Sequence, residues 1–346
     1  MAKSSFHHSD DHLCNELQKW IAQYSQVFLI TDSNVNEHVT PRILANLEKP
    51  ELIDIIEVDP GEASKSIEVV AQIMHHLIDS RAGRDCLIVN LGGGVVTDLG
   101  GFIASTYKRG VAFIHIPTSL MGMCDASIGG KTGIDMQDVK NVIGSFAYPK
   151  AVLIQPNFIS TLPRTHILSG FAEMVKHAVI ADPQLFEALE AVQGENPDHL
   201  ALFIERSTRI KEEIVMNDFL EEGQRKILNF GHTVGHALES FYMQKGFPIS
   251  HGHAVALGMI VESRISYNFG WLDDADYQKI ESLLNKYFSF PFSPDWFAVE
   301  HFLFQDKKNR NREVRFALSK NMGTCEWDIA IPLAEVRVAL EESLNG

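Results

Sequence analysis

Residues 86–98 read CLIVNLGGGVVTD, and this stretch decides the fold class of the chain. Its first part is a continuous apolar run, which is typical of a strand buried on both faces of a parallel sheet. Three glycines follow, and glycines at such a turn let the backbone approach a pyrophosphate at the N-terminus of the next helix. The run is not a complete GxGxxG pattern, because Thr97 occupies the place of the third glycine. On its own it leaves two interpretations open, a nucleotide site and an ordinary tight turn.

Similar apolar runs surround this stretch in the first half of the chain, at residues 26–31, 52–58, 111–116 and 151–154. Residues 66–80 instead carry apolar side chains at helical spacing. Strands that alternate with helices predict a parallel sheet with helices packed on its faces. Asp32 follows the first strand, where a carboxylate could accept the hydroxyls of a ribose, and a plain turn residue is the alternative.

From about residue 162 the pattern changes to helical periodicity, and the next strand signal comes only at residues 314–318. We expect two domains, an α/β Rossmann-like domain over residues 1–162 and a mostly α-helical domain over residues 163–346. The expected helical stretches are 166–180, 183–192, 199–216, 233–242, 254–269 and 274–287.

The composition argues against several classes of protein. With 346 residues, 45% of them hydrophobic, the chain is long enough for a large buried core. Its formal net charge of −15 disfavours nucleic acid as a partner, although a local cluster of Lys and Arg can still bind a small anion. No apolar run approaches the roughly 18–20 residues of a membrane span, and we expect neither secretion nor a membrane partner. Four scattered cysteines without a CxxC pair predict reduced, mostly buried thiols in a cytoplasmic protein.

A second group of residues has the chemistry of a metal site. Glu173 lies in one predicted helix, and histidines cluster near two others. Two imidazoles and one carboxylate make a three-ligand site with an open position for water or substrate. The spacing does not decide which two of four histidines would bind: His232, His236, His251 and His253. His177, four residues after Glu173, is a further candidate.

Basic side chains form a third signal. Lys131 follows two glycines in ASIGGKTG, which makes it the least ordinary lysine of the chain. Lysine and arginine bind phosphate and carboxylate groups, although most lysines on an acidic protein are solvated surface charges. Other candidates of this kind are Arg109, Lys140 beside Asn141, Lys176 and Arg225.

Eight motifs occur in order along the chain: GGGVVTDLGGF, YKRG, IPTSLMGMCDASIGGKTGID, KNVIGSF, TLPR, GFAEMVKHA, NFGHTVGHALE and SHGHAVALGM. Together they resemble the 3-dehydroquinate synthase family, and the similarity runs from about Asp32 to residues 306–308. The resemblance implies an N-terminal NAD-binding α/β domain, a helical C-terminal domain, an active site in the cleft between them, and a homodimer. Alternatives are another sugar-phosphate cyclase and a metal-dependent polyol dehydrogenase of the glycerol dehydrogenase kind.

The resemblance also implies roles for individual residues. Glu173, His232 and His251 match the metal ligands, usually of zinc or cobalt, which leaves His236 as a substrate-site residue that could relay protons. Positions that contact substrate in the family match Arg109, Asp125, Lys131, Lys140, Asn141, Lys176, Lys211, Glu221, Arg225 and Asn229, with Lys307 or Lys308. NAD contacts match Asp32, Asn34, Glu62, Lys65, Gly93, Gly94, Asp98, Thr118, Ser119, Lys131, Lys140 and Thr161.

The reaction implied by the resemblance turns 3-deoxy-D-arabino-heptulosonate 7-phosphate into 3-dehydroquinate and phosphate. It combines transient oxidation at C5 by NAD, β-elimination of phosphate, reduction and an intramolecular aldol closure, so the net redox change is zero. The substrate phosphate could itself take the C6 proton. Two positions depart from the family pattern: His253 stands where Glu is usual, and Asp135 where Asn is usual. These changes bear on fine substrate choice more than on reaction class.

Overall fold

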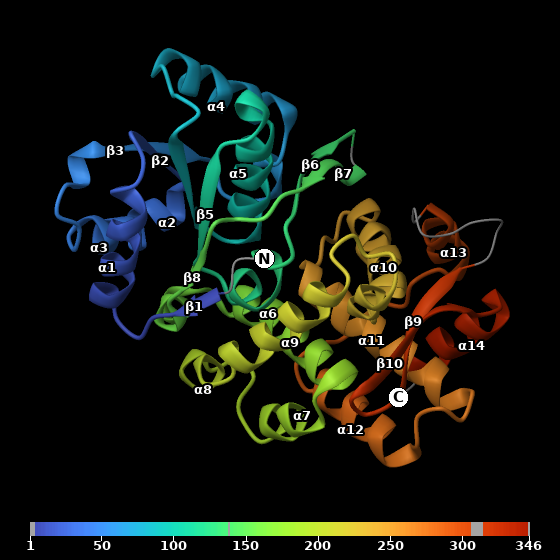
Figure 1. The fold of residues 1–346 in the computed structure, drawn as a ribbon. Helices are drawn as coiled ribbons and strands as arrows, with labels where there is room; N and C mark the ends of the chain where they lie inside the picture. Colours follow the sequence, from blue (N-terminus) through green and yellow to red (C-terminus); the bar gives the residue numbers. More distant parts are fainter. Residues whose placement is uncertain (1–3, 138, 306–313, 345–346) are drawn as a thin grey trace. The chain divides into compact units, whose positions relative to one another are not determined.

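The computed structural model describes residues 4–137, 139–305 and 314–344. The chain forms two compact units, Met1–Pro163 and Arg164–Gly346. Figure 1 shows the strands of a sheet in the first unit and mostly helices in the second. The fold class predicted from the sequence, an α/β Rossmann-like part followed by a mostly helical part, is confirmed.

The first unit is built on a six-stranded parallel sheet. In spatial order its strands are β1 (Ser4–Phe6), β8 (Val152–Ile154), β5 (Ala112–Pro117), β4 (Cys86–Gly92), β2 (Gln26–Asp32) and β3 (Ile53–Val58). All seven residues of β4 are buried, as the apolar run predicted for a central parallel strand. The five strands expected from apolar runs are all present, and β1 was not predicted because its sequence, SSF, is not an apolar run.

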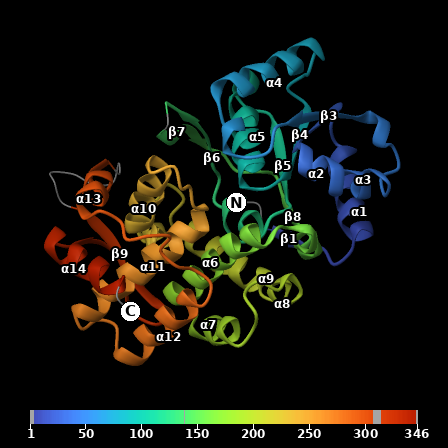
Figure 2. The ribbon, with the colours of Figure 1, turned by 180° about the vertical axis from the view of Figure 1, so that it is seen from behind.

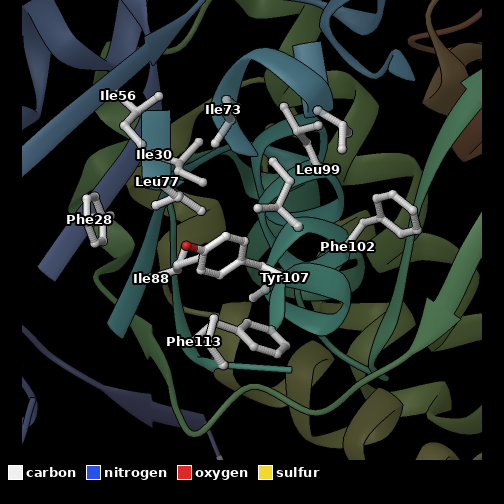
Figure 3. Close-up of a cluster of buried hydrophobic side chains, with 14 of the residues drawn as sticks. Phe28, Ile30, Ile56, Ile73, Leu77, Ile88, Leu99, Phe102, Tyr107 and Phe113 are labelled. Carbon is white, nitrogen blue, oxygen red and sulfur yellow. The ribbon is translucent and has the colours of Figure 1, made fainter. Parts of the chain in front are cut away.

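Helices cover both faces of this sheet. The helices α4 (Ile67–Asp79) and α5 (Gly94–Thr106) pack on one face, where they bury a cluster that includes Phe28, Leu77 and Leu99 (Figure 3). The helices α1 (Asp10–Ile21), α2 (Ser33–His38) and α3 (Thr40–Leu44) lie toward the other side, which Figure 2 shows from behind. Side chains of a strand alternate between the two faces of the sheet. The consecutive apolar residues of β2 therefore face the helices on both sides.

An antiparallel hairpin of β6 (Lys131–Met136) and β7 (Val139–Phe146) packs against α5. A Cβ on Gly101 of α5 would lie 2.6 Å from Cγ2 of Thr132, so the helix and the hairpin approach each other at a glycine. The sequence did not predict this hairpin, because residues 131–146 mix glycine, charged and apolar residues without a clear period of two.

The second unit consists mostly of helices. They are α6 (Arg164–Ala181), α7 (Pro183–Glu190), α8 (Pro197–Ala201), α9 (Ile204–Asn217), α10 (His232–Gln244), α11 (His251–Asn268), α12 (Asp274–Asn285), α13 (Trp296–Gln305) and α14 (Leu333–Ser343). The hairpin of β9 (Arg315–Asn321) and β10 (Thr324–Ala330) completes it. The stretch 199–216 was predicted as one helix, but it is divided between α8 and α9.

Helices α10 and α11 lie side by side (Figure 1), and glycines form part of their contact. A Cβ on Gly258 of α11 would overlap the carbonyl oxygen of Gly231, and one on Gly235 would lie 2.9 Å from the carbonyl oxygen of Ala254. Only glycine fits at these points, so the two backbones are held at a short and fixed separation.

The cysteines agree with the expectation of buried thiols. Cys14, Cys86, Cys124 and Cys325 are free and buried. Burial raises the pKa of the Cys14 thiol to about 12. Within the described part of the chain, none of the helices is both long enough and apolar enough to span a membrane.

Candidate metal centre and dinucleotide site

The second unit gathers one carboxylate and three imidazoles. Glu173 projects from α6, His232 and His236 from α10, and His251 from α11. The Nε2 atoms of His232 and His251 lie 3.6 and 3.7 Å from Oε1 of Glu173. Ring nitrogens of His232, His236 and His251 all lie within 4.8 Å of one another. Glu173 is 59 residues from His232 and 78 residues from His251 in the sequence, and in the fold these side chains meet at one point.

Hydrogen bonds fix the orientation of two of these rings. Nδ1 of His232 lies 3.1 Å from the carbonyl oxygen of Phe230, and Nδ1 of His251 lies 3.4 Å from Oε2 of Glu239. Each Nδ1 can donate its proton to these oxygens, which leaves Nε2 with a lone pair directed at Glu173. This arrangement is usual for metal-ligating histidines.

The donor set fits a divalent metal. With bonds of about 2.0–2.1 Å, neighbouring ligand atoms of a tetrahedral site lie about 3.4 Å apart, close to the separations from Glu173. Glu173 is only 1% exposed, and a buried carboxylate needs a cationic partner. Lys176, one turn later on α6, forms an ion pair with Oε2 of Glu173. The predicted ligands Glu173, His232 and His251 thus lie together, with Lys176 and His236 beside them.

The other candidate histidines lie differently. Nε2 of His253 lies 2.9 Å from the carbonyl oxygen of Ser289, and its ring packs near Phe288. Burial lowers the pKa of His253. Nδ1 of His177 lies 2.8 Å from Oγ of Ser207 on α9. His253, where the resemblance implies a glutamate, therefore joins the start of α11 to the segment after α12.

Several predicted substrate residues lie in the segment between α9 and α10. Nη1 of Arg225 donates to the carbonyl oxygen of Phe219 at 2.6 Å, and Nδ2 of Asn229 donates to Oε1 of Glu221 at 2.9 Å. The carboxylate of Asp218 accepts the backbone N–H groups of Glu222, Gly223 and Arg225, which closes this segment into a compact loop. Arg225 and Lys211 are buried. Lys307 and Lys308 lie outside the described residues.

In the first unit, the three glycines connect β4 directly to α5. Gly93 precedes the first residue of α5, and a Cβ there would lie 3.2 Å from Oγ of Ser119. A Cβ on Gly94 would lie 3.1 Å from the Cβ of Ala126. The backbone is thus closely approached by neighbouring loops, and the helix N-terminus offers the N–H groups and positive potential that suit a phosphate.

Lys65 is the centre of a polar cluster in this unit. Its Nζ lies 3.0 Å from Oδ2 of Asp98, 3.3 Å from Oε1 of Glu62 and 2.7 Å from Oδ1 of Asn141. Burial acts to lower the pKa of Lys65, but Asp98 and Glu62 outweigh it, so the pKa is raised. Three residues from three segments of the chain, Glu62, Asp98 and Asn141, are therefore brought together around the Lys65 cation.

Asp135, where the resemblance implies an asparagine, lies at the edge of this cluster. Its Oδ1 accepts the backbone N–H of Asn141 at 2.6 Å. Burial raises the pKa of the Asp135 carboxyl, and nearby Glu62 adds to the increase. An asparagine could accept the same hydrogen bond, so the exchange of Asn for Asp preserves the local geometry.

The remaining predicted residues of this unit lie at strand ends and turns. Asp32 ends β2, and its Oδ1 accepts the N–H of Val35, so it caps α2 as a turn residue would. Thr118 follows β5, where its N–H donates to the carbonyl oxygen of Gly92. The others are exposed or partly buried: Asn34 after β2, Arg109 after α5, Asp125 in the turn Gly122–Ala126, Lys131 and Lys140 on the hairpin, and Thr161 in the turn Pro156–Thr161.

Two glutamates beside the predicted metal ligands were not predicted. Glu239 follows His236 by three residues on α10, so helical spacing could have suggested it. Glu262 lies on α11, and its contact with the start of α10 depends on how the two helices pack. Local spacing in the sequence carries no signal for a contact of that kind.

Comparison with known proteins agrees with this description. Residues 55–169 match the family model for the N-terminal part of 3-dehydroquinate synthase, and residues 170–309 match the model for its C-terminal part. The 3-dehydroquinate synthase of Clostridium acetobutylicum is 39% identical over 324 residues, which covers 90% of each chain.

Solved structures share the fold at lower identity. The chain matches 2-deoxy-scyllo-inosose synthase, solved with carbaglucose-6-phosphate, NAD+ and Co2+, with a TM-score of 0.86 and 23% identity over 99% of this chain and 96% of the other. It matches 2-epi-5-epi-valiolone synthase from Streptomyces hygroscopicus subsp. jinggangensis, solved with NAD+ and Zn2+, with a TM-score of 0.86 and 24% identity over 100% and 98%. The N-terminal family model covers the glycine turn, and the C-terminal family model covers the histidine cluster. Because the two models together match most of the chain, the chain belongs to the 3-dehydroquinate synthase family.

Proposed function

We propose that this chain converts 3-deoxy-D-arabino-heptulosonate 7-phosphate to 3-dehydroquinate and phosphate, as a lyase of the shikimate pathway in aromatic amino acid biosynthesis. One observation carries the proposal: in a member of this family, Glu173, His232 and His251 present one carboxylate oxygen and two Nε2 atoms to a common point. Relatives with this activity by name are 37–39% identical over about nine tenths of the chain.

The cofactors follow from the two sites. Glu173, His232 and His251 would hold a divalent metal, zinc or cobalt, which supplies Lewis-acid polarisation of a substrate hydroxyl when bound. The glycine turn and the start of α5 would hold the pyrophosphate of NAD, which supplies reversible hydride acceptance. Asp32 would accept ribose hydroxyls, since it ends β2 at the carboxyl edge of the sheet.

The chain's own side chains would bind and orient the substrate. Lys176 and Arg225 are buried cations in the second unit, and buried cations suit the phosphate and carboxylate of a sugar acid. Lys131, Lys140 and Arg109 are proposed as further substrate contacts. Fixing both anionic ends of the substrate would restrict the geometry in which its protons move.

His236 is the proposed proton relay. Its ring centroid lies 5.3 Å from that of His232 and 5.6 Å from that of His251, so it borders the ligand set. Imidazole exchanges protons near neutral pH, which suits the hydroxyl and ketone chemistry expected at this site. The substrate phosphate could accept the C6 proton, so no separate carboxylate base is needed.

One assay separates this function from its alternatives. With heptulosonate phosphate, NAD and metal, we expect release of inorganic phosphate and formation of 3-dehydroquinate without accumulation of NADH. Steady NADH production from glycerol would instead identify a polyol dehydrogenase. Turnover of a different sugar phosphate to another carbocycle would identify a different cyclase.

The cell compartment and the assembly are part of the proposal. We propose a cytoplasmic homodimer, because the cysteines are free and buried and the family is dimeric by resemblance. Sedimentation at micromolar concentration tests the dimer, and a monomer with full activity would contradict it.

A further inference from the structure

Glu262 lies in the middle of α11 and is completely buried. Its Oε2 atom accepts the backbone N–H of Gly231 at 2.6 Å, and its Oε1 atom accepts the N–H of Val234 at 3.0 Å. These two N–H groups enclose the first turn of α10, whose first residue is His232. One buried carboxylate therefore holds the turn of helix that carries a proposed metal ligand.

This way of capping a helix differs from the usual one. An N-terminus is normally capped by a Ser, Thr, Asp or Asn that directly precedes the helix. Here the preceding residue is Gly231, with a φ of 78° that glycine adopts readily and no side chain that could accept a hydrogen bond. The acceptor comes instead from Glu262, 31 residues later. A carboxylate at a helix N-terminus is favoured by the helix dipole, which offsets the cost of burying it.

The packing of the two helices makes this contact rigid. Gly258 lies one turn before Glu262, and its Cα meets the carbonyl oxygen of Gly231 so closely that a Cβ would overlap it. On the other helix, Gly235 meets Ala254 in the same way. Because α10 cannot shift along α11 without breaking these contacts, the hydrogen bonds of Glu262 also set where His232 stands relative to His251.

We propose that Glu262 is a positioning residue for the metal centre, which acts by locking the first turn of α10 so that His232 and His251 are placed before the ion binds. The proposal rests on the proposed function in taking a divalent metal as the ligand. Both carboxylate oxygens of Glu262 accept backbone N–H groups at the start of α10. Its effect is transmitted through the backbone of residues 231–234.

Titration of metal-free protein with Co2+ tests the proposal through the visible absorption of the bound ion. Glu262→Gln keeps one amide oxygen as an acceptor but turns an NH2 group toward the second N–H, and Glu262→Ala removes both acceptors. Because supporting contacts of ligands are worth about 10–100-fold in metal affinity, we expect weaker Co2+ binding in that range, with Ala weaker than Gln. Ser266→Ala is the matched control, because it removes a buried hydrogen bond one turn away within α11 and should leave Co2+ affinity unchanged.

The readouts separate a positioning role from a purely structural one. A structural role would lower the melting temperature of the metal-free protein but leave the Co2+ affinity and spectrum of the folded variant as in the wild type. That result with Glu262→Gln would overturn the proposal. If neither variant folds, hydrogen exchange of the metal-free wild type tests the proposal. The proposal requires the amides of Gly231 and Val234 to be protected from exchange before metal is added. Rapid exchange there would refute it, whereas failure of the wild type itself to bind Co2+ would contradict the proposed function instead.

Discussion

His251 lies between two carboxylates, with Nε2 3.7 Å from Oε1 of Glu173 and Nδ1 3.4 Å from Oε2 of Glu239. The first contact places His251 among the proposed metal ligands. The second ties the far side of the ring to α10, the helix that carries His232. An imidazole whose second N–H is donated to a carboxylate is better oriented and more basic as a ligand.

Glu239→Gln is therefore expected to weaken metal binding by about 10-fold, because a neutral amide orients the His251 ring less strongly than a carboxylate. Competition between the protein and a chelator of known affinity measures the change. Glu213→Gln is the control, since Glu213 is an exposed glutamate on α9. Equal metal affinity in the two variants would show that Glu239 does not support His251.

His232→Ala should abolish turnover and reduce metal binding, while NAD still binds. The reason is that His232 belongs to the second unit, whereas the glycine turn between β4 and α5 belongs to the first. Calorimetric titration with NAD and metal analysis of the purified variant check both halves of this expectation. Turnover that persists in metal-stripped buffer would contradict the role given to His232.

Lys131→Ala should raise the KM for the sugar phosphate by about 10-fold or more, because a lost contact between a cation and a phosphate costs roughly 1.5–3 kcal/mol. Lys131 is the exposed first residue of β6. Initial-rate kinetics provide the measurement, with Lys150→Ala as a control at another exposed lysine of the same unit. Unchanged kinetics in Lys131→Ala would remove it from the substrate site.

His115 should make stability depend on pH. It is buried in β5, 3.2 Å from Nδ2 of Asn90, and burial lowers its pKa from 6.5 to about 3. Below about pH 6.5 the unfolded chain binds a proton that the folded chain does not, so the free energy of unfolding falls by up to about 1.4 kcal/mol per pH unit down to about pH 3. Above pH 6.5 this contribution is constant.

Urea unfolding of wild type and His115→Gln between pH 4.5 and 7.5 measures this contribution. The difference in stability between the two proteins should shrink or reverse as the pH falls. A difference that is independent of pH would mean that the pKa of His115 is the same in the folded and unfolded chains.

Gly258→Ala should destabilise the second unit strongly, because the added methyl group would overlap the carbonyl oxygen of Gly231. Overpacking of this kind costs about 1–3 kcal/mol or more, and relief by shifting α10 would also move His232. Thermal unfolding and Co2+ titration measure the two effects. Gly270→Ala is the comparison, since Gly270 has a φ of 69° but open space around it, and should lose about 1–2 kcal/mol without affecting metal binding.

The sheet of the first unit was predictable because each of its central strands is a continuous apolar run. In β4 every residue is buried, so hydrophobicity alone marks the strand. The hairpin of β6 and β7 was not predictable in this way. Most residues of β7 are exposed, and a glycine in each strand, Gly133 and Gly144, lets the two backbones approach closely.

Local spacing in the sequence predicted a metal site, but it did not decide which histidines belong to that site. Helical spacing placed His232 and His236 on one face, but it could not distinguish His251 from His253 two residues later. In the fold the helix directs these two rings apart, one toward Glu173 and the other toward the carbonyl of Ser289. Contacts such as that of Glu262 depend on packing between helices, which sequence periodicity does not encode.

The close fit of α10 against α11 also has a consequence for the segment that joins them. Residues 245–250 are almost all exposed, and Gly246 has open space around it. Since glycine contacts and Glu262 keep the two helices in register, their spacing does not depend on the length of this connection. The chain could therefore accept a longer loop, an affinity tag or new termini after Gly246 and still assemble the same pocket for its ion.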